Sequence, residues 1–293
     1  MALQPNTDLS PSSSGQLLDS PYRGDGSDRP LGVPLPPHKM PWFRAGRLLK
    51  RWRYVSLWSR DLSICAANIS VGPVRQEFWA VWDRKHRQLW ERTRLRPCCV
   101  TLVPNRLLVR DGGITIDVTL DEQAGFEVVV PDGQAYTWTR KQLVRAYGTV
   151  HLSNGPRQVE AMVLIDDNAG YHPRHTRWRW SGGAGQDTTG RAVGWSVIDG
   201  LNDPAHNSER TVWIDGVPQE VSTVSFEENL AGVVFHDGAQ LHFQAEAARE
   251  RRDNLLLVRS TYRQPFGTFT GALPGGIHLR EAYGVMEWHE AVW

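Results

Sequence analysis

The sequence has few cysteines and no long apolar run, and these absences narrow the classes of protein to which it can belong. Its 293 residues include Cys65 and the adjacent pair Cys98 and Cys99, a poor basis for a disulfide framework. The longest apolar runs are short, as in Leu255–Val258, and lie far below the ~20 residues that span a bilayer. Residues 1–14 lack the charged start and apolar core of a signal peptide. We therefore expect reduced thiols, with a reactive Cys98–Cys99 dithiol as the alternative, no transmembrane segment, and a cytoplasmic protein.

Charge of one sign is also missing, as are the common nucleotide-binding and nucleophile motifs. The 33 Lys and Arg residues nearly balance the 32 Asp and Glu residues, so net charge gives no reason to expect nucleic acid as a partner. No phosphate-binding loop, Gly-x-Gly-x-x-Gly turn or Gly-x-Ser-x-Gly elbow occurs, and the run Gly182–Gly185 opens onto a polar loop. These absences argue against nucleotide-dependent transfer and α/β-hydrolase chemistry, and no cofactor or metal is expected.

The N-terminal part of the chain divides into two segments of distinct composition. Residues 1–37 are rich in Pro, Ser, Gly and Asp, a composition that cannot bury enough apolar surface to fold, so we expect a disordered tail. Residues 44–53 then place five basic side chains around Leu48, Leu49 and Trp52. This segment is interpreted as a solvated first strand, with weak contact to a membrane surface as the alternative.

From there the pattern is that of antiparallel β-strands. Residues 113–120 alternate apolar and polar side chains without a break, as in a half-buried strand. Asp-Gly pairs at 132–133, 215–216 and 237–238 separate β-type runs, and such pairs favour the tight type I′ turns of hairpins. The sequence therefore predicts an all-β protein built from hairpins, arranged as sandwiches or barrels.

The β-type region divides into two halves of similar texture. A boundary after Ile165 gives an N-terminal domain at 38–165 and a C-terminal domain at 166–293. About eight strands per half is the size at which a sheet closes into a barrel that holds one small ligand. We expect two tandem antiparallel barrels, or strongly curved sandwiches, and the sequence does not fix the oligomeric state.

The segment from Asp166 to Trp180 concentrates polar and aromatic side chains and is the first candidate site. Its first five residues have the composition of a turn. On the strand that follows, Trp178 and Trp180 would share one face and wall a flat or apolar substrate. His172 or His175 would act as the general acid or base, oriented by Asp166 or Asp167. The alternative is a structural plug at a barrel mouth, and the His-x-x-His spacing lacks a third zinc ligand.

Two further clusters contain groups that can bind or react. At the C-terminus, Glu287 and His289 share one face of a strand, where they would move a proton in a cavity or form an exposed edge. The stretch Trp138-Thr139-Arg140-Lys141 places two cations beside a Trp, and these would hold an anionic group of a ligand or cap the sheet.

Several strings resemble a bacterial family known as a domain of unknown function (number two thousand eight hundred and four), over about residues 38–293. They are 50–54, 66–69, 78–83, 169–180, 264–269 and 283–287. More distantly, the chain resembles the double-lipocalin proteins of the hydroxyneurosporene synthase and AttH-like type. That resemblance implies two lipocalin-like barrels in tandem, with a lipophilic substrate in a barrel and acid–base residues at its wall.

The sequence supports three hypotheses about function. The first is a binder of a lipophilic small molecule, or an acid–base enzyme of the hydratase, cyclase or isomerase kind, because a dry pocket raises carboxyl pKa values. The second is a carbohydrate-active or carbohydrate-binding sandwich, and the third is an interaction module whose Trp residues are all core. The candidate catalytic residues are His172, His175, Asp167, Glu287 and His289. The candidate ligand-binding residues are Trp138, Arg140, Lys141, Arg174, Trp178, Trp180 and Tyr283.

Overall fold

The computed structural model describes residues 19–255 and 258–293, and this part of the chain is all-β, as predicted. Its strands form two large antiparallel sheets and one short hairpin, β2 (Phe43–Arg44) with β3 (Arg47–Leu48). Among the described residues, no helix is long and apolar enough to cross a membrane.

The first sheet contains eleven strands and curls strongly. Its strands are β1 (Tyr22–Gly24), β4 (Lys50–Trp58), β5 (Leu62–Val71), β6 (Val74–Asp83), β7 (Gln88–Arg94), β8 (Val100–Val103), β9 (Arg106–Asp111), β10 (Ile114–Leu120), β11 (Phe126–Asp132), β12 (Ala135–Leu152) and β13 (Gly155–Gly170). The order is β7-β6-β5-β4-β13-β12-β10-β9-β8, and β11 pairs with both β12 and β1.

The second sheet contains nine strands from the C-terminal part of the chain. They are β14 (His175–Asp187), β15 (Ala192–Asp199), β16 (Thr211–Ile214), β17 (Val217–Glu220), β18 (Val224–Phe226), β19 (Gly232–Phe235), β20 (Gln240–Leu255), β21 (Val258–Leu273) and β22 (Ile277–Val292). The order is β17-β16-β15-β14-β22-β21-β20-β19-β18. The chain passes from one sheet to the other between Gly170 and His175, and the domain boundary expected after Ile165 stays a prediction.

Apolar side chains fill the inside of the curled first sheet. At one level of the sheet, Ile165, Val55, Ala66 and Trp79 are cross-strand partners on β13, β4, β5 and β6, and all four are buried in the same cluster. Alternate residues of a strand point to opposite faces, so the residues between them face the other way. Those outward residues pack against the second sheet.

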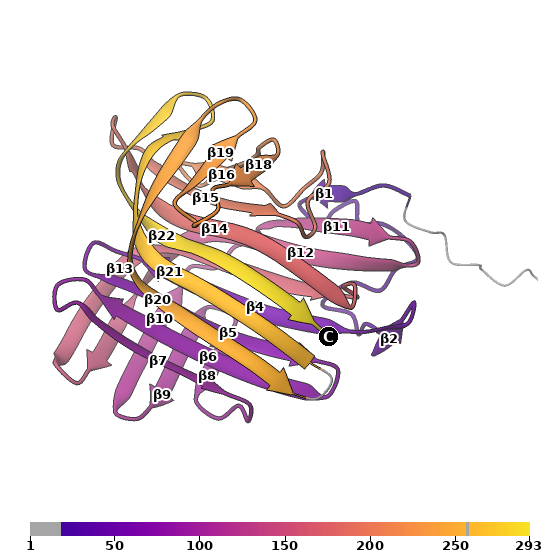
Figure 1. Ribbon diagram of the computed structural model, residues 1–293, viewed down its shortest axis with the longest axis horizontal. Coiled ribbons are helices and arrows are strands. Elements are labelled where there is room, and N and C mark those ends of the chain that lie inside the picture. The colour runs from indigo at the N-terminus through magenta and orange to yellow at the C-terminus, as the bar shows by residue number, and fades with distance from the viewer. Residues whose placement is uncertain (1–18, 256–257) are drawn as a thin grey trace, which may run out of the picture.

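The long strands β20, β21 and β22 of the second sheet lie across the outer face of the first sheet (Figure 1). A separate apolar cluster lies between the two faces and includes Trp58, Trp82, Trp180, Phe266 and Val285. Polar contacts join the same faces, because Trp82 Nε1 donates to Glu246 at 2.7 Å and Arg249 Nε donates to Glu91 at 2.8 Å. The interface between the sheets is therefore a core in its own right.

The Asp-Gly hairpins occur where the sequence predicts them. Asp215 and Gly216 join β16 to β17, and both have positive φ, 49° and 82°, as a type I′ turn requires. Gly133 and Gly238 also have positive φ in the turns that end β11 and precede β20. Turn chemistry therefore fixes the hairpins of this fold locally.

The predicted turn at 166–170 is wrong, because these residues are the last five of strand β13. Basic side chains on the two neighbouring strands bind the carboxylates there: Lys141 pairs with Asp166 at 2.6 Å, and Arg53 pairs with Asp167 at 2.9 Å. Asp and Asn are unfavourable in isolated strands. Cross-strand ion pairs offset that preference here.

The predicted disordered tail does not hold for residues 19–37, and residues 1–18 lie outside the described residues. Tyr22–Gly24 form β1, which pairs with β11. Arg29 forms an ion pair with Glu127, and Leu35 is 3% exposed among apolar side chains. Composition did not predict this order, because a few specific contacts, and not the average hydrophobicity of the segment, hold it to the sheet.

Replacing Leu35 by alanine should therefore lower the free energy of unfolding by about 2–3 kcal/mol, the cost of a cavity in a packed core. Urea denaturation measures this change. Leu31 is 86% exposed, so its replacement by alanine is the matched control and should change stability by less than about 0.5 kcal/mol. Equal effects of the two substitutions would show that the segment does not dock.

Candidate active site

A cavity of about 150 Å³ lies between the facing surfaces of the two sheets. Aromatic side chains from β4, β6, β14 and β21 line it: Trp52, Tyr54, Phe78, Trp178, Trp180 and Tyr262. Trp293, after β22, and polar side chains such as Asn202, Arg251 and Asp253 also line it. Ala67, Ile69, Ile198 and Leu201 complete the apolar lining. The curled first sheet is called the first barrel below. The cavity lies on its outer face, whereas its inner face is packed with apolar side chains.

Two residues of the C-terminal cluster face this cavity, with the alternation that the sequence predicts. Glu287 and His289 on β22 line the cavity, whereas Met286 and Trp288 pack into the core on the other face of the second sheet. The two Trp residues of β14 line the same cavity, so strands distant in the sequence bring the two candidate clusters together.

Side-chain donors surround the carboxyl group of Glu287. Trp178 Nε1 donates to it at 2.8 Å, and Gln264 Nε2 donates at 3.0 Å. Burial raises the pKa of Glu287, and these hydrogen bonds, the nearby hydroxyl of Tyr262 and the charge of Arg249 oppose that rise only in part. A glutamic acid whose pKa is raised by burial can act as a general acid or base toward a molecule in the cavity.

His289 lies beside this carboxyl group as a neutral imidazole. Its Nε2 is 2.7 Å from Ser260 Oγ, and its ring lies 4.2 Å from that of Trp178 between centroids. Burial lowers the pKa of His289 to about 3. The imidazole is therefore uncharged at neutral pH and adds no positive charge that would lower the pKa of Glu287.

A buried charge cluster lies at another part of the cavity wall, and sequence reasoning found only part of it. Lys141 Nζ is 2.6 Å from Asp166 and 3.9 Å from Glu209, and all three side chains are buried. Burial raises the pKa of Glu209 to about 7 and that of Asp166 as well, although Lys141 opposes both shifts. One ammonium group balances one of the two carboxylates, so the other favours its protonated form.

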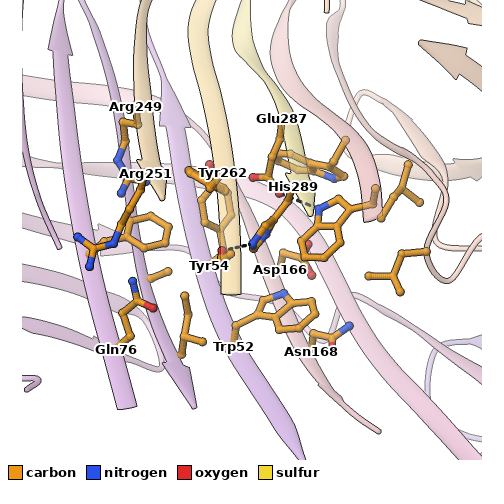
Figure 2. Close-up of a pocket in the computed structure, with 18 of the residues that line it drawn as sticks. Trp52, Tyr54, Gln76, Asp166, Asn168, Arg249, Arg251, Tyr262, Glu287 and His289 are labelled. Atoms are coloured by element: carbon orange, nitrogen blue, oxygen red, sulfur yellow. Dashed lines mark hydrogen bonds between the residues drawn. The ribbon is translucent and has the colours of Figure 1, made fainter. Parts of the chain in front are cut away.

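One hydrogen-bond donor of the cavity wall has no hydrogen bond among the described residues. Arg249 is 3% exposed and pairs with Glu91, yet its second terminal nitrogen, Nη1, is buried without a hydrogen bond. The Tyr262 ring packs against both Arg249 and His289, with its centroid 5.5 Å from the guanidinium carbon and 5.3 Å from the imidazole centroid. Figure 2 shows Tyr262 beside His289, with Arg249 farther along the same wall.

The predicted grouping of Asp167 with His172 and His175 does not form. Because Asp167 alternates with Asp166 on β13, it faces the inside of the first barrel, where Arg53 and Arg140 bind it. His172 is buried against Trp52, and burial with nearby Lys50 lowers its pKa to about 3. His175 is 64% exposed and pairs with Glu290, away from the cavity.

The remaining sequence candidates also lie outside the cavity lining. Trp138 and Arg140 line the mouth of the first barrel, because they point to the face of β12 opposite to that of Lys141. Arg174 is exposed in the crossing between the sheets. Tyr283 lies under the guanidinium of Arg84 and donates to Glu281. Lys141 contributes through Asp166 and Glu209, which do line the cavity.

Glu209, Arg249 and Tyr262 were missed in the sequence, and the available signal differs among them. Tyr262 and Gln264 alternate with Arg263 on β21. Because side chains of a strand alternate between two faces, this pattern predicts that Tyr262 and Gln264 share an inward face. Arg249 lies in a run of charged residues that is typical of an exposed strand, and Glu209 lies in a loop before β16 without a motif. Only the fold shows that these two charges are buried.

Comparison with known proteins gives a family and a fold. A family model described as a domain of unknown function, DUF2804, matches residues 100–293, a shorter span than the 38–293 expected. No curated protein matches the chain by sequence. The structure is similar to that of an AttH-like protein from Nitrosomonas europaea, with a TM-score of 0.54 and 12% identity over 88% of this chain and 98% of that one.

Two further solved structures are similar to this one. Kievitone hydratase from Nectria haematococca matches with a TM-score of 0.51 and 10% identity, over 82% of this chain and 88% of that one. CghA with Sch210972 matches with a TM-score of 0.41 and 11% identity, over 93% of this chain and 98% of that one. The first two likenesses confirm the predicted double-lipocalin fold, and at these identities they show the fold alone.

Proposed function

The chain belongs to the DUF2804 family, whose description states no function, and we propose that it binds a neutral apolar small molecule between its two sheets and transfers a proton on it. The observation that carries this proposal is the Glu287 carboxyl group, which has a raised pKa and faces a cavity walled by aromatic rings. A protonated carboxyl group there can donate to a carbon or an oxygen of the bound molecule.

The unpartnered donor of Arg249 indicates an oxygen atom on that molecule. A buried donor without a hydrogen bond costs roughly 1–3 kcal/mol, and Nη1 of Arg249, which lines the cavity, is in this state. A carbonyl oxygen would accept from it, and the developing negative charge of an enolate would strengthen that bond. The ionised form of Glu287 would take a proton from a carbon next to that carbonyl group, and the resulting carboxylic acid would return the proton to the enolate at another carbon, as in isomerisation of an unsaturated ketone.

The buried cluster around Lys141 supports this chemistry from the cavity wall. Asp166 and Glu209 together carry more negative charge than Lys141 can balance. Burial and the nearby Asp166 raise the pKa of Glu209 to about 7, so a second carboxyl group of the cavity wall can hold a proton. The proposal is thus an enzyme that uses its own carboxyl groups for acid–base catalysis, and the hydratase among the structurally similar proteins is consistent with that reaction class.

Binding of the neutral fluorophore N-phenyl-1-naphthylamine tests the cavity. Ala67 lines it and is 1% exposed, so Ala67→Leu should fill space and weaken binding of the fluorophore at least tenfold. Ala67→Ser, which adds one atom, is the matched control and should bind nearly as the parent does. Unchanged affinity of Ala67→Leu, with a native melting profile, would place the fluorophore elsewhere and contradict the proposal.

A further inference from the structure

The mouth of the first barrel is a second hollow, on the opposite face of the sheet from the cavity. It has a volume of about 700 Å³. Its walls are the inward-facing ends of β4, β5, β6, β12 and β13, the start of β8, and the segment around Pro36 and Pro37. Trp52, Ile69, Gln76 and Asn168 line both hollows, whereas Glu287 and His289 line the cavity alone.

Two rows of side chains cross the strands at this mouth. The inner row lies in register as Arg140, Asp167, Arg53, Asn68 and Glu77. The outer row lies in register as Trp138, Ala169, Arg51, Ser70 and Arg75. The packed apolar core begins at the next level inward on β13, β4, β5 and β6, whereas β12 has Gln142 there, so four strands change from apolar to polar at the same depth. A change that coincides on four neighbouring strands marks the floor of a hollow.

The carboxylates of this hollow are already bound by cations or backbone N–H groups of the chain. Arg53 and Arg140 both bind Asp167, at 2.9 and 2.6 Å. Arg29 binds Glu127. Glu77 accepts from the backbone N–H groups of residues 98, 99 and 100 at 2.9–3.1 Å. None of these carboxylates is left to balance the outer row.

The outer row therefore contains donors without acceptors. Arg51 and Arg75 are exposed, and neither has an acidic partner within ion-pair distance in the described part of the chain. Trp138 is 5% exposed, and its Nε1 is buried without a hydrogen bond. Arg53 Nε is buried and unpartnered in the row beneath. A buried indole N–H and two unbalanced guanidinium groups at one opening form a site for an anion.

The hollow is also larger than a single inorganic anion requires, and part of its wall is apolar. Trp138, Val100, Pro36, Pro37 and Pro97 supply that part. We propose that the mouth of the first barrel binds a small organic anion, with its carboxylate or phosphate at Arg51, Arg75 and Trp138 and its apolar body against this wall. This site is separate from the proposed proton-transfer site and does not depend on it.

Calorimetric titration with 2-naphthoate and 2-naphthyl phosphate tests this site, with 2-naphthalenemethanol as the neutral analogue. We expect both anions to bind, the alcohol to bind at least tenfold more weakly, and the affinity of the anions to fall between 50 and 500 mM NaCl. The tighter of the two anions identifies the group that the site prefers.

The double variant Arg51→Gln/Arg75→Gln should weaken binding of the anions at least tenfold, and Trp138→Phe, which keeps a ring and removes the N–H, about threefold. Arg110→Gln/Arg145→Gln removes the same charge from exposed positions on the same sheet and should bind as the parent does. Ala67→Leu should also leave anion binding unchanged, which separates this site from the cavity. Equal affinity for the alcohol and the anions, or equal affinity of all variants, would overturn the proposal.

Discussion

Replacing Glu287 by glutamine should slow the exchange of the α-protons of 2-tetralone for solvent deuterium by about 10²–10⁴-fold, the usual contribution of a positioned acid or base. 2-Tetralone is apolar and carries one carbonyl oxygen, which matches the aromatic rings of the cavity and the unpartnered Nη1 of Arg249. The amide of glutamine can accept the hydrogen bond from Trp178 but cannot transfer the proton. Proton NMR in deuterated buffer measures the exchange rate.

The control for this experiment is Glu281→Gln, since Glu281 is an exposed residue of the same strand. With Glu281→Gln, the α-protons of 2-tetralone should exchange at the rate seen with the parent protein. Glu287→Gln should also retain a parent-like affinity for N-phenyl-1-naphthylamine, because the cavity keeps its shape. If the parent protein exchanges the protons no faster than buffer, although the fluorophore binds in the cavity, the protein is a binder and the acid–base part of the proposal is wrong.

Replacing Lys141 by methionine should lower the free energy of unfolding by about 3–5 kcal/mol at pH 8, the cost of leaving a buried ion pair without one partner. Lys141 is fully buried and is the cation nearest to both Asp166 and Glu209. Without it, both carboxyl groups must take up protons in the folded state, whereas they ionise freely in the unfolded chain. Urea denaturation gives the size of the loss.

The sign of the pH dependence follows from these carboxyl groups. In the parent protein the pKa of Glu209 is already raised to about 7, so the folded state binds this proton more tightly than the unfolded state does. Stability from such a group is complete below the unfolded pKa and is lost as the pH rises through the folded pKa. Lys141→Met raises the folded pKa values further, so its cost should be smaller at pH 5 than at pH 8.

The exposed Lys85 provides the matched control, and Lys85→Met should change stability by less than about 0.5 kcal/mol at either pH. Adding Asp166→Asn to Lys141→Met should recover part of the loss, because it removes one of the two unbalanced carboxylates. A loss that is equal at pH 5 and pH 8 would show that packing, and not charge, explains the effect of Lys141→Met.

Much of the fold was predictable because its signals are local. Asp215-Gly216 and Asp237-Gly238 specify hairpins through backbone conformations that few other residues adopt. Alternation placed Trp178 with Trp180, and Glu287 with His289, on the faces where the structure has them. Local rules, however, cannot reveal which face of a sheet a distant strand will cover.

The errors came from interactions between strands that are distant in sequence. Asp166 and Asp167 have the composition of a turn, but Lys141 and Arg53 on neighbouring strands hold them extended. The cavity expected inside a barrel stays a prediction. The inside of the first barrel is filled by apolar side chains, and the aromatic cavity lies between the two sheets.

The central claim is that the cavity between the sheets holds a neutral apolar molecule, and native mass spectrometry of the protein purified from its source tests it most directly. The account predicts one small molecule per chain, extractable into organic solvent, that is present on the parent protein and on Ala67→Ser but absent from Ala67→Leu. A molecule that stays bound to Ala67→Leu at the same stoichiometry, or a polar molecule released by salt, would contradict the claim.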